Sequence, residues 1–187
     1  MRLMGHPVVK VICLCVINFA SSATGDEALI EDFSNSPESR WEYFADTVMG
    51  GVSQGRVEFL ADADNSYLKL VGAVSTSNNG GFIQARTRLI SPLDKIFKGL
   101  KLRVRGNGEM YFVHIRTSGT RLPWQYYQAS FPTTEDWSYI NIPFADFEPS
   151  GKFMRKSLVA GKIRSIGIVA YGRDHFADLE VETLGLY

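Results

Sequence analysis

Residues 99–117 read GLKLRVRGNGEMYFVHIRT and give the strongest indication of the fold class. In both halves of this stretch apolar and polar side chains alternate, which is the pattern of a β-strand with one buried face. The dipeptide Asn107-Gly108 between the two halves accepts positive φ and predicts a hairpin turn. Elsewhere almost no stretch keeps a helical period for three turns, so the sequence indicates an all-β protein.

Similar short runs continue on both sides of this stretch. They predict strands at Ile30–Phe33, Trp41–Phe44, Arg56–Leu60, Tyr67–Val74, Gly81–Arg88, Gly99–Arg105, Met110–Thr117, Tyr126–Phe131, Ser138–Ile142, Ile163–Ala170 and Leu179–Leu186. One helical turn is expected at Ser91–Lys98, and a long surface loop at Phe147–Lys156. So many short strands in a chain of 187 residues predict a single-domain β-sandwich or jelly roll.

The composition is that of a globular protein without a strong overall charge. Hydrophobic residues make up 45% of the chain and charged residues 21%, which is sufficient for a buried core. Lys and Arg number 20 and Asp and Glu also number 20, so there is no net charge to attract nucleic acid or an anionic membrane. We therefore expect no nucleic-acid partner.

The N-terminus has the pattern of an export signal. After the basic residue Lys10, the apolar run VICLCVINFA covers residues 11–20, and Ser21-Ser22-Ala23 supplies small residues for cleavage. The sequence therefore predicts a signal peptide at residues 1–23 and a β-sandwich domain at residues 24–187, secreted or periplasmic. The alternative is an uncleaved signal that anchors the protein in the membrane. Otherwise we expect membrane contact only through a partner.

No cofactor or metal site is expected. Cleavage after Ala23 would remove Cys13 and Cys15, the two cysteines of the chain, and with them any disulfide, thiolate ligand or cysteine nucleophile. The acidic turn at residues 62–65 lacks the glycine and the distal glutamate of a dedicated Ca²⁺ loop.

Several motifs resemble those of one known family. They are Trp41, DTVMGGVS at residues 46–53, SNNGGF at 77–82, Arg86, LKLRVRGNG at 100–108, Trp137, IPFADF at 142–147 and DLEV at 178–181. Over nearly all of the predicted mature chain, the sequence resembles the NADH:ubiquinone oxidoreductase complex I intermediate-associated protein 30 family. The resemblance implies a β-sandwich of galactose-binding-like type without enzymatic activity and, in the mitochondrial members, a chaperone-like role in assembling respiratory complex I. Here a secretory signal replaces the mitochondrial presequence. The partner would be an envelope protein or a respiratory-complex subunit.

Two glycine-containing loops of this motif set are expected together at one rim of the sandwich. Their residues are Asp46, Met49, Gly50, Gly51, Ser53, Asn78, Asn79, Gly80 and Gly81. Asp46 can accept hydrogen bonds from backbone N–H groups one or two residues later in an Asx-turn, and adjacent glycines indicate positive φ or close backbone approach. The loops either hold the strands in register or form part of a ligand rim.

The stretch Gly51–Gly55 also fits G-x-S-x-G, the nucleophile motif of α/β-hydrolases. That motif requires a strand before the serine and a helix after it, whereas residues 56–59 continue as an alternating strand. Of the histidines beyond the predicted signal, His114 and His175, neither lies in a catalytic pattern. We expect no catalytic residues.

Strand alternation also predicts one polar and aromatic sheet face. Its outward residues are Gln84, Arg86, Phe112, His114, Arg116, Tyr126 and Gln128. Aromatic rings and directional amide or guanidinium groups suit a sugar or an extended peptide. The alternative is a face covered by the long loops, filled with structural hydrogen bonds.

The sequence therefore predicts a non-enzymatic binding protein. The first hypothesis is an exported protein-binding or assembly factor that resembles the respiratory complex I assembly proteins. The alternative hypothesis is a carbohydrate-binding module of a secreted protein, for which the partner would be a glycan.

Overall fold

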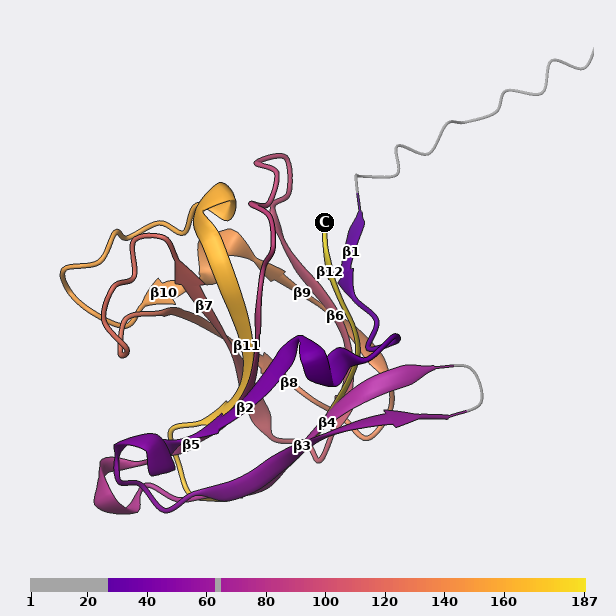
Figure 1. Cartoon of the computed structure of the whole chain (residues 1–187), viewed down its shortest axis with the longest axis vertical. Coiled ribbons are helices and arrows are strands. Elements are labelled where there is room, and N and C mark those ends of the chain that lie inside the picture. The colour runs from indigo at the N-terminus through magenta and orange to yellow at the C-terminus, as the bar shows by residue number, and fades with distance from the viewer. Residues whose placement is uncertain (1–26, 63–64) are drawn as a thin grey trace, which may run out of the picture.

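The protein is a two-layer β-sandwich in the computed structural model, which describes residues 27–62 and 65–187 (Figure 1). Two six-stranded sheets form the layers, and the helical elements of the described residues are short 3-10 turns. This architecture confirms the predicted all-β fold of one domain. The predicted signal peptide, residues 1–23, lies outside the described residues.

The first sheet has the strand order β3-β4-β12-β6-β9, with β1 paired to β12. All its strand pairs are antiparallel. Its strands are β1 (Ala28–Glu31), β3 (Gln54–Ala61), β4 (Ser66–Val74), β6 (Gly99–Gly106), β9 (Ser138–Pro143) and β12 (His175–Leu186).

The second sheet has the order β10-β8-β7-β11-β5-β2 and is also antiparallel. Its strands are β2 (Trp41–Ala45), β5 (Phe82–Arg88), β7 (Met110–Thr117), β8 (Tyr127–Pro132), β10 (Glu148–Pro149) and β11 (Ile163–Tyr171). Strands β7, β11 and β5, far apart in the chain, lie side by side in its middle, which is visible in Figure 1.

The core lies between the sheets and consists of every second residue of the central strands. In β7, Tyr111, Val113 and Ile115 are fully buried, while the residues between them are partly exposed. Leu102 and Val104 of β6 are buried in the same way from the opposite layer. Each alternating strand therefore gives one side to the core and leaves the other side available for a site.

The turn at Asn107-Gly108 corrects one expectation. It does not close a hairpin, because β6 belongs to the first sheet and β7 to the second. Gly108 does adopt a positive φ of 81°. The Tyr111 hydroxyl donates to Asn107 Oδ1 at 2.8 Å and accepts from the Asp178 N–H at 2.8 Å, so the turn is tied to both layers. Apolar and polar residues alternate in the same way in two strands joined by a hairpin and in two strands that cross from one sheet to the other. The sequence pattern therefore does not distinguish a hairpin from a crossover.

Two further differences concern the loops. Residues 91–98 form a turn instead of the expected helical turn, and the expected loop at 147–156 begins with the short strand β10. Within residues 27–62 and 65–187, no helix has the length and apolar character needed to cross a membrane.

Candidate functional site

The candidate site lies on the outer face of the second sheet, where one row of residues crosses five strands. The register aligns Gln128 of β8, His114 of β7, Gly167 of β11, Arg86 of β5 and Glu42 of β2. Because a strand turns alternate side chains to opposite faces, all members of this row face away from the core. Gly167, at the centre of the row, contributes no side chain and is buried.

A groove of about 420 Å³ lies over this row. Its lining comes from the sheet and from the loops at 46–52, 77–81 and 118–126. The lining residues are Phe44, Val48, Met49, Asn79, Gly80, Phe82, Gln84, Arg86, His114, Arg116, Pro123, Trp124, Tyr126, Ser165 and Tyr171. A Cβ atom at position 167 would come within 3.1 Å of Gln84 Oε1, so glycine at that position gives the amide its place on the groove floor.

Aromatic rings build one side of the groove. The rings of His114 and Tyr126 stack with centroids 4.1 Å apart at an angle of 15°, and Tyr171 meets His114 edge-on at 5.4 Å. The hydroxyl groups of the two tyrosines lie 3.5 Å apart. Trp124, on the neighbouring loop, keeps 63% of its side chain exposed. These half-buried rings hold one another in place, and the tryptophan remains exposed at the groove.

His114 is neutral at physiological pH. Burial lowers its pKa to about 4, against an opposing contribution from the side chain of Gln128. His114 Nε2 and Gln128 Oε1 are buried, and neither reaches a partner with hydrogen-bond geometry among the described residues. Gln128 lies opposite His114 in the strand register but outside the groove lining, so of these two atoms only His114 Nε2 belongs to a residue of the groove.

Arg86 is held in the groove by one aromatic contact and one weak ion pair, which leave its guanidinium available to a ligand. Its guanidinium lies 4.1 Å from the ring centroid of Phe44, and it forms an ion pair with Glu42 at 3.6 Å. The Glu42 side chain is 60% exposed, so this pair is weak. Among the described residues these contacts join Arg86 to the neighbouring strand β2 and not to a covering loop.

Arg116 lies on the outward face, as its strand position predicts, but its guanidinium serves the fold. Its guanidinium donates to the backbone carbonyls of Leu122 and Pro123 at 2.9 and 2.8 Å. Arg116 therefore fixes the loop that carries Trp124. It lines the groove, but its hydrogen bonds are structural.

All seven residues expected on the outward face do lie on one face of the second sheet. Those that line the groove are Gln84, Arg86, His114, Arg116 and Tyr126. Phe112 and Gln128 lie in the same rows but outside the groove lining; Phe112 packs edge-on against Tyr171 at 5.6 Å. The alternation of strand residues could not identify Trp124 as a groove residue. Trp124 lies on a loop, and the side chains of a loop do not point to opposite sides at regular intervals.

The two motif loops meet at one end of the groove, and a buried carboxylate joins them. Asp46 is fully buried, and its carboxylate accepts from the Ser53 N–H at 2.9 Å, the Ser53 hydroxyl at 2.5 Å and the Gly81 N–H at 2.5 Å. Burial alone would raise the pKa of Asp46, but these hydrogen bonds and one from Phe82 outweigh it and lower the pKa. The expected local Asx-turn is wrong, because the partners lie 7 and 35 residues away.

Glycine is required in these loops for two separate physical reasons. Gly50 and Gly81 adopt positive φ of 94° and 128°. Gly51 and Gly80 do not, but a Cβ atom at either position would collide with the Asp46 carboxylate. Asn78 and Asn79 also adopt positive φ, of 57° and 58°, in the 3-10 turn η3 (Ser77–Asn79).

The loops also serve as a rim. Val48 and Met49 of the 3-10 turn η2 (Asp46–Met49) are 71% and 59% exposed and line the groove together with Asn79. The structural and the ligand-rim interpretations of these loops are therefore compatible, because different residues carry them.

Ser53 lacks the geometry of a hydrolase nucleophile. Its side chain is 1% exposed, and its hydroxyl donates to Asp46 instead of pointing into a cleft. No helix follows it, since β3 begins at the next residue. In the described part of the chain, no cluster of His, Cys, Asp and Glu could hold a metal ion.

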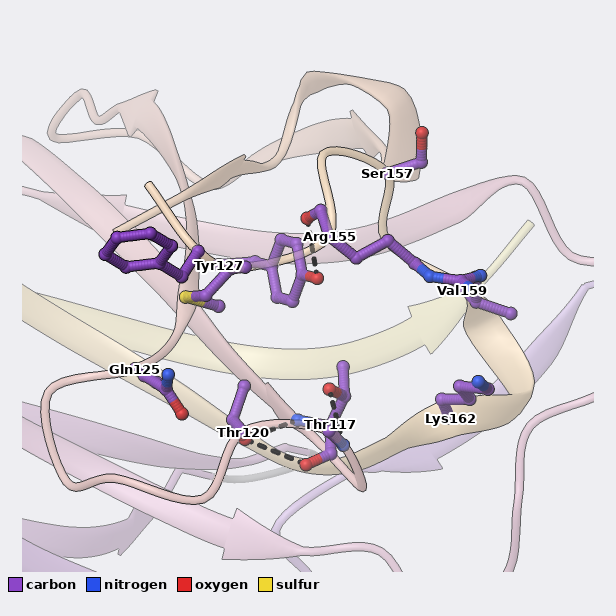
Figure 2. A pocket seen from close by; sticks show the side chains of 11 residues that line it. Thr117, Thr120, Gln125, Tyr127, Arg155, Ser157, Val159 and Lys162 are labelled. Atoms are coloured by element: carbon purple, nitrogen blue, oxygen red, sulfur yellow. Dashed lines mark hydrogen bonds between the residues drawn. The ribbon is translucent and has the colours of Figure 1, made fainter. Parts of the chain in front are cut away.

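A second, smaller pocket of about 130 Å³ lies beside β7 and β8 (Figure 2). Tyr127 donates through its hydroxyl to the Arg155 carbonyl at 2.8 Å across this pocket. The Thr120 hydroxyl donates to the Thr117 carbonyl and accepts from its N–H. These polar groups satisfy one another, which indicates a structural role for the pocket.

Comparison with known families gives one match, to the model described as Complex I intermediate-associated protein 30 (CIA30), over residues 31–181. No curated protein matches the chain in sequence.

Several solved structures share the fold. The family 11 carbohydrate-binding module from Clostridium thermocellum, solved in complex with a β-1,3-1,4-mixed-linked tetrasaccharide, superposes with a TM-score of 0.69 at 14% identity, over 86% of this chain and 94% of the module. A family 30 carbohydrate-binding module gives a TM-score of 0.51 at 14% identity, over 72% of this chain and 91% of the module. An exo-β-agarase gives 0.56 at 11% identity, over 84% of this chain but 24% of the agarase. At these identities the likeness shows the fold: a jelly roll of galactose-binding-like type.

Proposed function

We propose that this chain, which belongs to the complex I intermediate-associated protein 30 family, is a non-catalytic domain that binds a glycan in the groove of its second sheet. The observation that carries the proposal is the groove itself, with its packed aromatic side, an exposed tryptophan at its edge and the polar side chains of Gln84 and Arg86 in its lining. Its fold relatives include modules whose descriptions name carbohydrate binding, which supports the same reading.

The chemistry of the groove fits a sugar ring. The apolar face of a pyranose packs on an aromatic side chain, and Trp124 and Tyr126 offer such surfaces without a need to reorganise. Gln84 and Arg86 supply directional donors and acceptors for hydroxyl groups. Among the described residues that line the groove there is no carboxylate, and its histidine is neutral, so these groups are suited to hold a ligand.

Trp124 provides the test. In affinity gel electrophoresis against soluble polysaccharides, including mixed-linked β-glucan and agarose oligomers, we expect at least one to retard the protein. Trp124→Ala should abolish that retardation. The matched control is Tyr139→Ala, which removes an aromatic side chain that is also 63% exposed, but on β9 of the other sheet. Retardation that survives Trp124→Ala, or no retardation by any of the glycans, contradicts the proposal.

A second candidate function is that of an assembly factor for a protein partner, an envelope protein or a respiratory-complex subunit. Family membership and the exposed apolar rim of Val48 and Met49 favour it. Cross-linking of the mature protein in envelope extract should then capture one defined partner, and Val48→Lys should reduce that capture while glycan retardation stays the same.

We also propose that the protein is exported after removal of residues 1–23. The apolar run and the small residues that follow it support this location. Export is compatible with either ligand.

A further inference from the structure

A second hollow opens at one end of the groove and is lined by five arginines. It measures about 380 Å³, and its arginines are Arg86, Arg88, Arg116, Arg121 and Arg164. Arg86, Arg116, Pro123 and Ser165 line both the hollow and the groove, so the two spaces are continuous. The formal charge of the whole chain is zero, and this concentration of cations is therefore a local feature.

The charges of the hollow are largely unbalanced. Within the described residues, the single ion pair of these five arginines is the one from Arg86 to the exposed Glu42. Arg116 and Arg164 donate to backbone carbonyls, which carry no net charge. Burial, together with the nearby charge of Arg86, lowers the pKa of Arg116. The fold thus keeps like charges together without placing carboxylates among them.

The outer face of the first sheet shows the opposite arrangement. Its cations pair with carboxylates: Lys69 with Asp178 and Glu180, Lys101 with Glu27, Arg103 with Glu182 and Arg105 with Glu180. The same chain therefore neutralises its cations on one face and leaves them available on the other.

We infer that the groove and the hollow together form a site for an acidic glycan, whose neutral rings lie in the aromatic groove and whose carboxylate or sulfate group lies among the arginines. This inference rests on the proposed glycan-binding function and names its substrate class. Guanidinium groups match the planar geometry of carboxylate and sulfate oxygens and form charge-assisted hydrogen bonds with them.

The position of the charges favours a glycan over other polyanions. The groove beyond the hollow adds no further cation, since Arg86 and Arg116 are its charged lining residues and both belong to the hollow. A nucleic acid or a polyglutamate segment carries a charge at every unit and requires cations along its whole path. A glycan in which neutral units lie beside a charged unit fits a groove whose positive charges are confined to the hollow at one end.

The test compares neutral and acidic oligomers by calorimetry. The probes are mixed-linked β-glucan, a partly esterified polygalacturonate for carboxylate and a carrageenan for sulfate. We expect one acidic oligomer to bind more tightly than the neutral one at about 50 mM salt and to lose that advantage at about 500 mM, where charges are screened within a few ångströms.

Variants then locate the effect. R88Q/R121Q/R164Q, which changes exposed side chains, should weaken the acidic oligomer about tenfold or more and leave the neutral one unchanged. Arg88→Gln alone should have a smaller effect. The matched control is Arg56→Gln, an exposed arginine on β3 of the first sheet, which should change nothing. Thermal melts should show that all variants fold.

The outcomes separate the inference from the proposed function. Neutral binding that Trp124→Ala abolishes, without any advantage of the acidic oligomers or any effect of the triple variant, overturns the inference and leaves the function standing. Failure of all three oligomers to bind overturns the inference, and it contradicts the proposed function as well when no other polysaccharide retards the protein. Arginine-dependent binding of polyglutamate or single-stranded DNA in place of the glycans also overturns the inference, because the hollow would then serve another polyanion.

Discussion

Asp46 shows how one residue can hold two loops that are distant in sequence. Its carboxylate is fully buried and receives hydrogen bonds from Ser53 and Gly81, while Gly51 and Gly80 leave the space that it occupies. Charged acceptors that serve buried donors contribute more than neutral ones, and their loss leaves the donors without partners. The shape of the groove rim therefore depends on this carboxylate.

We predict that Asp46→Asn lowers the free energy of unfolding at pH 7 by about 2 kcal/mol, because an amide cannot accept from all of these donors. The difference between wild type and variant should shrink in acid. The folded-state pKa of Asp46 is lowered, so its contribution is complete above the unfolded value and is lost as the pH falls through the folded value.

Urea melts at pH 7 and at about pH 3 measure this difference. The control is Asp136→Asn, which changes an exposed carboxylate. A variant at position 46 that is as stable as wild type at pH 7 would show that the loops are held by something else.

His114 gives a second pH dependence, in a different range. Its folded pKa of about 4 lies below the ordinary value of 6.5, so the unfolded chain takes up a proton first as the pH falls. The contribution of this residue is therefore fully present above pH 6.5 and is lost progressively toward pH 4. Between pH 7 and pH 5 we expect a loss of about 2 kcal/mol that His114→Gln largely removes. Thermal melts at several pH values measure this loss. If the stability of wild type and variant falls equally between pH 7 and pH 5, the prediction is wrong.

At the scale of the elements, strand β7 serves three purposes through its alternation. Its inward residues build the core, His114 lies on the floor of the groove, and Arg116 at its end holds the following loop. Other hydrogen bonds also restrain the loop between β7 and β8. The N–H groups of Arg121 and Leu122 donate to Gln125 Oε1, and the Ser150 hydroxyl donates to the Trp124 carbonyl at 2.8 Å. The position of the exposed Trp124 thus depends in part on an arginine of the adjacent strand.

We predict that Arg116→Gln loosens this loop without unfolding the sandwich, because a glutamine side chain is too short to reach both carbonyls. Trypsin should then cleave after Arg121 several times faster than in wild type, as judged by mass spectrometry of timed digests. Arg88→Gln, which removes an exposed arginine of β5, two strands away in the same sheet, is the control and should leave the rate unchanged. Equal cleavage rates would show that the carbonyl contacts do not restrain the loop.

At the scale of the whole molecule, the two outer faces are chemically different. The first sheet carries neutralised ion pairs, and the second carries an aromatic groove with a cationic end. A sandwich whose charged side chains are paired with one another on one face and left available on the other is suited to bind on one side only. We infer that its recognition surface is the second sheet.

Export belongs to this scale as well. We predict that the protein isolated from its native host begins at Thr24, since the apolar run ends in Ser21-Ser22-Ala23. Intact-mass measurement of the protein from cell fractions checks this. Protein that retains Met1 and stays in the cytoplasm would contradict export, and protein that retains Met1 in the membrane fraction would favour an uncleaved anchor.

Alternation alone placed the outward residues of β5, β7 and β8 on one face, because the period of two is a local property of the backbone. The same reasoning could not decide that β6 and β7 belong to different sheets. It also could not anticipate that Gly51 serves a carboxylate instead of a positive φ, since the reason lies in contacts between distant segments.

Local periodicity and residue type were therefore sufficient to predict the all-β class, the family motifs and the composition of one polar face. Which strands are neighbours is known only from the folded chain. The same arrangement joins two loops through Asp46 and brings the Arg116 guanidinium to the loop that carries Trp124. It also places arginines from β5, β7, β11 and a loop around one hollow. The physical reason is that a binding site is made by side chains that are close in space, and their separation in sequence carries no signal of that proximity.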